Sequence, residues 1–405
     1  MSSILFTPHR IGALEIPNRF VASALYEGLA APDGKASPKL LGRYGKLGRG
    51  EIGLIIPGHM FVHPLGRAQK FQTGISSDDM IPGLAELAAA ARQGGGRVIF
   101  QLAHAGRQTT RDLIGARPAG PSSRPRDPAY LTTPREMSES DLKTVIDAFA
   151  AAARRAEAAG ADGVQLHAAH GYLLHQFLSP LLNRRRDAWG RDDQGRFRLL
   201  EEIIQKVRRA LPARMAVLVK LSAEDFTNPP GMTPELSAKY AAWMVQLGVD
   251  ALEVSGGAGN FSPFNVCRGD VPVKEMALGL PWWQRPLGRL MLGRMAGKFD
   301  LAEAYNLAAA RAIKPVLGSV PLILVGGMRR LSAMEEVVSA GVADFISLGR
   351  PLLRDPFVVK KFKQGEADES SCLSCNRCLA AIVNHLPVHC YRNGLPPKGP
   401  RKGAA

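Results

Sequence analysis

Short apolar runs alternate with longer amphipathic segments along most of this chain. The runs are rich in strand-forming residues, and most of the segments between them repeat apolar residues at helical spacing. The runs cover residues 19–25, 53–57, 97–102, 163–167, 215–221, 251–255, 321–326 and 345–349. The clearest helical segments cover residues 82–92, 139–159, 197–210, 233–247 and 332–340. Eight strand–helix repeats predict an α/β fold of the (β/α)8 TIM barrel type.

A doubly wound sheet is the alternative arrangement of alternating strands and helices. A dinucleotide-binding sheet of that kind opens with a glycine-rich fingerprint after its first strand, and this chain has none there. The barrel is therefore favoured.

Helix ends support the repeated strand–helix unit. Ser138 or Ser140 and Thr233 are predicted to cap two helices through their hydroxyl groups. Three helices end in a glycine, which suits the left-handed position after a helix, and an aspartate follows just before the next strand. These pairs are Gly160 and Asp162, Gly248 and Asp250, and Gly341 and Asp344.

Two segments are too long to be simple connections and are predicted insertions in the barrel loops. They cover residues 108–137 and 256–301, and the second contains Trp282 and Trp283 followed by a basic amphipathic run at 285–298. We expect a lid, a subunit contact or a partner-docking helix there, with membrane contact as a further option. The predicted division is a barrel at residues 1–362 and a cysteine-rich extension with a basic tail at 363–405.

Length and charge narrow the function classes. The chain has 405 residues, and its apolar runs fall far short of the roughly 20 residues that a membrane span needs. No basic segment followed by an apolar core opens the chain, so a cytoplasmic protein is expected. The net charge of +16 suits anionic ligands, but the basic residues are scattered without interleaved aromatic residues, so nucleic-acid binding is not predicted.

The segment at residues 165–180 carries the chemistry that organises the chain. It begins as a buried strand and then presents His167, His170 and Tyr172. In a barrel of parallel strands, catalytic groups gather where the strands end. A zinc site at the two histidines is conceivable, but no third and fourth ligand accompany them. The alternative is a purely structural role, in which one histidine caps a neighbouring strand and the tyrosine only packs.

Six motifs, in order, resemble the Old Yellow Enzyme family of flavin-dependent oxidoreductases. They are IPNRF at 16–20 with Ser23, QLAHAGR at 101–107, HAAHGYLLHQFLSP at 167–180, VKLS at 219–222, VGGM at 325–328 and LGRP at 348–351. The resemblance implies FMN at the barrel mouth, reduced by NADH or NADPH, and hydride transfer to an activated C=C bond of an unsaturated carbonyl or dienoyl substrate. It also implies that His167 and His170 bind the carbonyl oxygen and that Tyr172 donates a proton.

The same resemblance assigns the cofactor contacts. Lys220 stands where many members have an arginine beside the flavin pyrimidine, and Gln101 would bind the pyrimidine edge. The remaining expected FMN contacts are Ser23, Ala24, Gly326, Gly327, Gly349 and Arg350. The alternative to FMN contact for the glycines is that they only form tight turns. Three residues depart from the usual pattern, namely Ala24 in place of a proline, Tyr26 in place of a threonine or cysteine, and His59 in place of a small residue.

Four of the five cysteines follow the last strand as C-x2-C-x2-C-x11-C. Such spacing suits a [4Fe-4S] cluster or tetrahedral zinc. Cys372, Cys375, Cys378 and Cys390 resemble the cluster-binding segment of the 2,4-dienoyl-CoA reductase and trimethylamine dehydrogenase branch, and free thiols remain an alternative. A second function is therefore kept open: a flavin and iron–sulfur subunit that passes electrons to a partner protein. A homo-oligomer is also possible, and Cys267 looks unrelated to the cluster.

Overall fold

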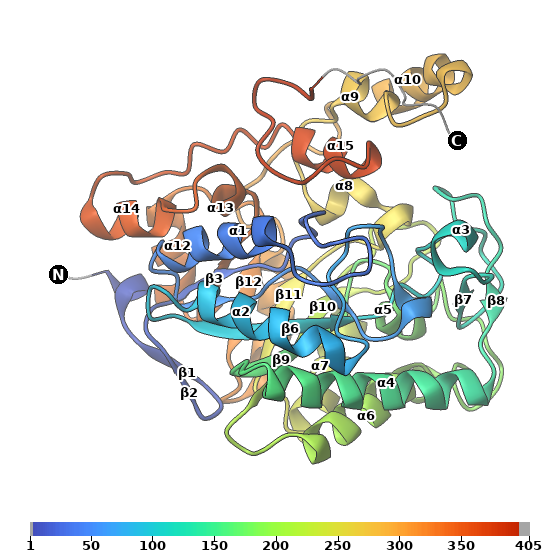
Figure 1. The fold of residues 1–405 in the computed structure, drawn as a ribbon, viewed down its shortest axis with the longest axis horizontal. Helices are drawn as coiled ribbons and strands as arrows, with labels where there is room; N and C mark the ends of the chain where they lie inside the picture. The colour runs from blue at the N-terminus through green and yellow to red at the C-terminus, as the bar shows by residue number, and fades with distance from the viewer. Residues whose placement is uncertain (1–2, 397–405) are drawn as a thin grey trace.

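Eight parallel strands close into a barrel at the centre of the molecule, as the sequence predicted (Figure 1). The computed structural model describes residues 3–396. Each barrel strand corresponds to one predicted run, and the pairing of β4 with β6 closes the ring. The strands are β3 (Phe20–Ala22), β4 (Leu54–Ile55), β6 (Arg97–Ala103), β9 (Gly163–Ala168), β10 (Ala216–Ser222), β11 (Ala251–Ser255), β12 (Leu322–Val325) and β13 (Phe345–Leu348).

Helices surround the barrel and bury its outer face (Figure 1). The five predicted helices are confirmed as α2 (Ile81–Ala91), α4 (Glu139–Ala158), α6 (Asp193–Ala210), α7 (Pro234–Gln246) and α12 (Leu331–Ser339). Further helices are α1 (Pro38–Gly48), α5 (Leu173–Leu178), α11 (Leu307–Ile313), α13 (Arg350–Arg354) and α14 (Val358–Gln364). None of the helices within residues 3–396 has both the length and the apolar character of a membrane span.

The barrel interior is apolar at the end where the amino termini of the strands lie. The hairpin of β1 (His9–Ile11) and β2 (Leu14–Ile16) places Ile11 and Ile16 against inward-facing residues of the strands, such as Val21 and Leu218. Burial of this cluster stabilises the barrel. Polar inward-facing residues lie further along the strands, toward their carboxyl ends, where the active site of such a barrel is expected.

The predicted glycine–aspartate junctions recur with one geometry. Each glycine has a positive φ, between 67° and 77°. Each aspartate carboxylate then accepts a hydrogen bond from a backbone N–H at the start of a strand: Val98 donates to Asp162, Val217 to Asp250 and Leu322 to Asp344. Ser138 caps α4 in a capping box with Asp141, and Thr233 caps α7. Both ends of the strand–helix unit therefore follow from local sequence.

The two insertions contain short elements of their own. Residues 108–137 include α3 (Arg111–Ile114), β7 (Ala119–Gly120) and β8 (Arg135–Glu136). Residues 256–301 include α8 (Pro263–Val266), α9 (Val273–Ala277) and α10 (Arg285–Gly293). The second insertion also contains the 3-10 turns Gly259–Phe261 and Trp282–Gln284. Short pieces elsewhere are β5 (Met60–Phe61) and the 3-10 turns Ile4–Phe6, Pro64–Gly66, Asp78–Met80 and Lys314–Leu317.

The cysteine-rich extension packs on the mouth of the barrel and contains α15 (Arg377–Val383), which contacts α9 (Figure 1). The division of the chain at residue 362 stays a prediction, and α14 runs across it. Residues 397–405, which make up nearly all of the predicted basic tail, lie outside the described residues.

Candidate active site

A cavity of about 320 Å³ opens at the carboxyl ends of the barrel strands. This volume lies in the range of small-molecule sites, roughly 300–1,000 Å³. All eleven residues that the sequence assigned to catalysis or FMN binding line it. They are Ser23, Ala24, Gln101, His167, His170, Tyr172, Lys220, Gly326, Gly327, Gly349 and Arg350. Their common location is a finding, whereas their roles stay predictions.

His167, His170 and Tyr172 converge at the end of β9. The His167 ring centroid lies 5.2 Å from that of His170 and 4.8 Å from that of Tyr172. His170 Nε2 lies 2.7 Å from Ser255 Oγ, whereas His167 Nδ1 is buried and has no hydrogen-bond partner within the described residues. Burial lowers the pKa of both histidines well below the usual value, so both rings are neutral at neutral pH.

A buried pair fixes the turn that carries these side chains. His170 and Gly171 both have positive φ, 59° and 73°. The Gly171 N–H donates to His175 Nδ1 at 2.7 Å, and His175 Nε2 lies 2.7 Å from Asp225 Oδ1. His175 and Asp225 are fully buried. Because the turn is strained for His170, this anchored ring holds it in place.

A charged network lies at the floor of the cavity. Lys220 Nζ donates to Ser23 Oγ at 2.8 Å and to Glu253 Oε1 at 3.2 Å. Burial alone would raise the pKa of Glu253, but the charge of Lys220 and hydrogen bonds from Ser347, Gln165 and Ser23 outweigh it and lower that pKa. The Glu253 carboxylate is therefore ionised, and it balances the charge of Lys220.

Gln101 joins the same network. Its Nε2 donates to Gln165 Oε1 at 2.6 Å, and Gln165 Nε2 donates to Glu253 Oε2 at 2.9 Å. The sequence singled out Gln101 and Lys220 but missed Gln165 and Glu253. The signal in the sequence that could have identified them is a polar residue inside an apolar run. In the structure, strand register places Gln165 beside Gln101 and Glu253 beside Lys220.

Glycines and arginines line the cavity at the ends of β12 and β13. A Cβ at Gly326 would lie 2.8 Å from Asn306 Nδ2, and one at Gly327 would clash with the Ala302 carbonyl oxygen. A Cβ at Gly349 would meet its nearest neighbour, a Leu25 methyl group, at 3.6 Å, an ordinary contact. Only the first two positions therefore exclude a side chain.

Two arginines connect this end of the cavity to the cysteine segment. Arg350 Nη1 donates to Asn376 Oδ1 at 2.6 Å, and Arg329 Nη2 donates to Ser374 Oγ at 2.6 Å. Arg329 also lines the cavity, although the sequence did not identify it. Its position directly after the VGGM motif was the only available signal.

The four predicted metal-binding cysteines line one small cavity of about 20 Å³. No three histidine, cysteine, aspartate or glutamate side chains among residues 3–396 are arranged as ligands of a metal ion. Metal binding therefore stays a prediction. Leu379 and Ile382 of α15 line the larger cavity, so the extension supplies part of its wall. Cys267 lines that cavity as well, and its carbonyl accepts a hydrogen bond from Asn376 Nδ2 at 2.9 Å, which places it against the cysteine segment.

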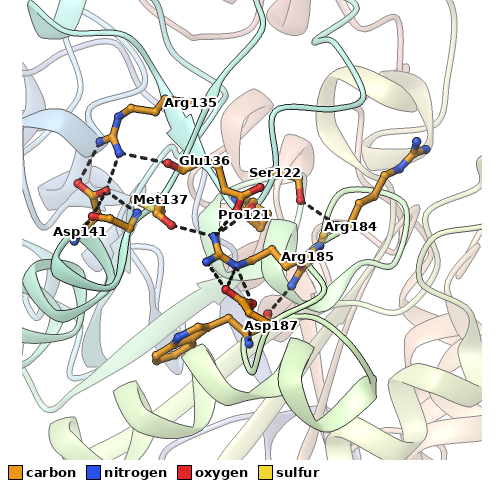
Figure 2. A network of polar contacts seen from close by, with 12 residues as sticks. Pro121, Ser122, Arg135, Glu136, Met137, Asp141, Arg184, Arg185 and Asp187 are labelled. Atoms are coloured by element: carbon orange, nitrogen blue, oxygen red, sulfur yellow. Dashed lines mark hydrogen bonds and ion pairs between the residues drawn. The ribbon is translucent and has the colours of Figure 1, made fainter.

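The first insertion supplies Gln108 and Tyr130 to the cavity wall. Figure 2 shows how Arg185 fastens this insertion to the barrel. The Arg185 guanidinium donates to the carbonyls of Met137 at 2.8 Å and Pro121 at 3.2 Å, and it also pairs with Asp187. Because this guanidinium is buried and also lies 3.5 Å from Glu136 Oε1, its contacts hold the insertion in one place.

The second insertion reaches the cavity only through its first part. Pro263, Val266 and Cys267 line the wall, whereas none of residues 282–298 does. The side chains of Trp282 and Trp283 are exposed by 79% and 64% of their area. Residues 282–298 therefore do not cover the cavity, and the lid, subunit contact and partner-docking helix expected for the whole segment stay predictions.

Comparison with known proteins identifies the family. Residues 4–259 match the model of the NADH:flavin oxidoreductase / NADH oxidase family. The chain is 33% identical over 395 residues to an NADH oxidase of Thermoanaerobacter brockii, covering 96% of this chain and 56% of that protein. It is 35% identical over 362 residues to the NADPH dehydrogenase of Bacillus subtilis, covering 89% of this chain and 94% of that protein.

A solved structure shows the same fold. A complex of 2-naphthoyl-CoA reductase superposes with a TM-score of 0.83 at 23% identity, covering 96% of this chain and 56% of that one. This chain thus spans little more than half the length of the reductase and of the NADH oxidase. With the motifs in order around one cavity, these matches show that the chain belongs to the NADH:flavin oxidoreductase / NADH oxidase family, the Old Yellow Enzyme family that its sequence resembles.

Proposed function

We propose that this protein is an FMN-dependent NAD(P)H oxidoreductase that reduces the activated C=C bond of an unsaturated carbonyl or dienoyl substrate. The observation that carries the proposal is the meeting of His167, His170 and Tyr172 with Lys220 in one cavity. Family membership supports the flavin, and the cavity residues support the type of acceptor.

The cavity fits FMN. Lys220 supplies a buried cation at its floor, which suits the pyrimidine edge of a flavin, where negative charge gathers on reduction. Gly326 and Gly327 line the cavity at the end of β12, close to where phosphate binds in many barrels, and Arg329 and Arg350 supply positive charge there. Ser23, Ala24, Gln101 and Gly349 complete the proposed contacts. Bound FMN would accept hydride from NAD(P)H and supply it to the alkene.

The side chains above the floor act on the substrate. His167 and His170 are neutral, so each can donate a ring N–H to the substrate carbonyl oxygen. These hydrogen bonds stabilise the negative charge that develops on the oxygen as hydride reaches the β-carbon. Tyr172 then gives its phenolic proton to the α-carbon, so that its O–H bond breaks as the new C–H bond forms, and solvent later restores the proton.

We further propose that Cys372, Cys375, Cys378 and Cys390 hold a [4Fe-4S] cluster. The four cysteines line one small cavity, and their C-x2-C-x2-C-x11-C spacing suits such a cluster. All four are free thiols. Thiolates are the ligands that such clusters use in proteins.

The packing of the cysteine segment against the larger cavity favours a second candidate function, and Arg350 lines both cavities. Leu379 and Ile382 belong to the cysteine segment and also line the larger cavity. A cluster held there would lie beside a flavin, so the protein could instead pass electrons to a separate partner protein. Loss of NAD(P)H oxidation when such a partner is removed, with no reduction of any alkene, would favour this alternative.

Visible absorbance tests the proposed function. Purified protein loaded with FMN should lose its flavin absorption when NADH or NADPH is added without oxygen. Addition of an enone such as 2-cyclohexenone should restore that absorption and yield the saturated ketone. A flavin that is reduced but never reoxidised by enones or by an enoyl-CoA ester would contradict the proposal.

A further inference from the structure

His59 lies within contact of the proposed proton donor. Its Nε2 is 3.2 Å from the Tyr172 hydroxyl oxygen, and the two ring centroids are 5.0 Å apart. His59 is buried and lines the cavity. The sequence marks it only as a departure from the usual pattern, and the mechanism above gives it no role.

Gln72 determines which nitrogen of His59 carries the proton. The Ala68 N–H donates to Gln72 Oε1 at 2.7 Å, which fixes the orientation of the side-chain amide. Gln72 Nε2 therefore points at His59, where it donates to the carbonyl at 3.1 Å and lies 2.6 Å from Nδ1. An amide N–H at that distance requires an unprotonated Nδ1 as acceptor. The single proton of a neutral ring must then be on Nε2.

The surroundings keep the ring neutral. Burial, together with the charge of Lys220, lowers the pKa of His59 to about 4, although its own backbone carbonyl opposes the shift. The other titratable rings that face it are Tyr26, His167 and Tyr172. At neutral pH, His59 therefore has one N–H to give, and the nearest acceptor is the Tyr172 hydroxyl oxygen.

We propose that His59, oriented by Gln72, is the positioning residue of the proton donor: its Nε2–H donates to the Tyr172 oxygen. This inference rests on the proposed function. Because the hydroxyl accepts from His59, its own hydrogen is free to point into the cavity. When that proton moves to the substrate carbon, the phenolate left behind keeps the hydrogen bond from His59, and water later returns a proton to it.

The opposite arrangement makes a different prediction. If Nε2 were unprotonated, Tyr172 would donate its hydrogen to His59 and none would be directed at the substrate. Burial raises the pKa of Tyr172, which makes loss of its proton harder. A hydrogen bond that favours the charged form offsets this cost. The two arrangements therefore differ in the state of His59 and in the rate of proton transfer.

Nitrogen-15 NMR of histidine-labelled, FMN-loaded protein tests which ring nitrogen of His59 carries the proton. Comparison with His59→Gln assigns the His59 signals. We expect Nδ1 to resonate as an unprotonated nitrogen and Nε2 as a protonated one at neutral pH, and we expect Gln72→Leu to mix the two tautomers. A protonated Nδ1 of His59 in the unmodified protein would overturn the proposal.

Rapid-mixing kinetics test whether His59 affects the rate of proton transfer to the substrate. His59→Phe and Gln72→Leu should slow reoxidation of reduced flavin by an enone about tenfold or more, the effect of losing one hydrogen bond to a developing charge. Flavin reduction by NAD(P)H should change less than twofold. His63→Phe is the matched control, because His63 does not line the cavity and should leave both steps unchanged.

The double variant separates positioning from mere packing. Added to Tyr172→Phe, the His59→Phe change should have no further effect, since its hydrogen-bond partner is gone. Equal slowing in both backgrounds would overturn the inference and leave the proposed function intact. If Tyr172→Phe alone leaves reoxidation unchanged, the proposed function fails instead.

Discussion

Lys220 and Glu253 form a buried ion pair across two neighbouring barrel strands, with 3.2 Å between Lys220 Nζ and Glu253 Oε1. Ser23, Ser347 and Gln165 complete the hydrogen bonds of the carboxylate. The cation that we assign to the flavin therefore does not act alone. Its effect is moderated by a carboxylate directly beside it.

Glu253→Gln should make the reduction potential of bound FMN more positive. The change removes a negative charge beside Lys220, so the cation acts unopposed on the negative charge of reduced flavin. A shift of at least about 30 mV is expected, equivalent to about 1.4 kcal/mol for a two-electron couple. Potentiometric titration against a reference dye measures it. Glu157→Gln is the control, because Glu157 does not line the cavity. A negative shift, or no shift, for Glu253→Gln would show that the carboxylate does not moderate the charge of Lys220.

Asp225→Asn should lower the free energy of unfolding by about 3 kcal/mol at neutral pH, because it breaks a buried pair with His175. Burial opposes ionisation of Asp225, but His175, Ser179 and the Met232 N–H outweigh it and lower its pKa. The folded-state pKa thus lies below the unfolded value of about 3.9. The stabilisation is present above that pH and is lost as the pH falls through the folded-state pKa.

Urea unfolding at several pH values checks this prediction. The difference in free energy of unfolding between the unmodified protein and Asp225→Asn should become smaller below about pH 4. Asp78→Asn is a suitable control, since the side chain of Asp78 is 81% exposed and its pair with Arg155 should contribute less than about 1 kcal/mol. If this difference in free energy does not change with pH, the charge of Asp225 is not the source of the stabilisation.

Substitution of any one of Cys372, Cys375, Cys378 or Cys390 by alanine should abolish stoichiometric iron and acid-labile sulfide in protein purified without oxygen. Each cysteine is proposed as one of four cluster ligands. Cys267→Ala should retain both, because Cys267 lies outside the small cavity that the four share. Zinc in place of iron and sulfide, or iron that survives all four substitutions, would show the proposed cluster to be wrong.

Much of the fold could be predicted because its determinants are local. Strands buried on both faces read as apolar runs, and Gly160, Gly248 and Gly341 mark helix ends through their own backbone preference. The helices α1 and α11 were not singled out from the sequence. Helix α1 contains glycine at positions 42, 45 and 48, which weakens a helical pattern.

The site was predictable only as far as its motifs extend. His167, Tyr172 and Lys220, which the motifs single out, line one cavity. The partners of these residues come from distant segments, so no spacing in the sequence connects Lys220 with Glu253 or Tyr172 with His59. For the same reason, the sequence does not connect Cys267 with the cysteine segment, although the Cys267 carbonyl accepts a hydrogen bond from Asn376. Contacts of that kind are determined by strand register and loop packing.

Rapid mixing of FMN-loaded Tyr172→Phe tests the central proposal most directly. Phenylalanine keeps the ring and removes only the proton that the hydroxyl gives to the substrate carbon. We expect flavin reduction by NAD(P)H to change less than twofold and reoxidation by an enone to slow at least about 100-fold, within the range known for general acids. Equal slowing of both half-reactions, or no slowing of reoxidation, would contradict the assignment of Tyr172 as the proton donor.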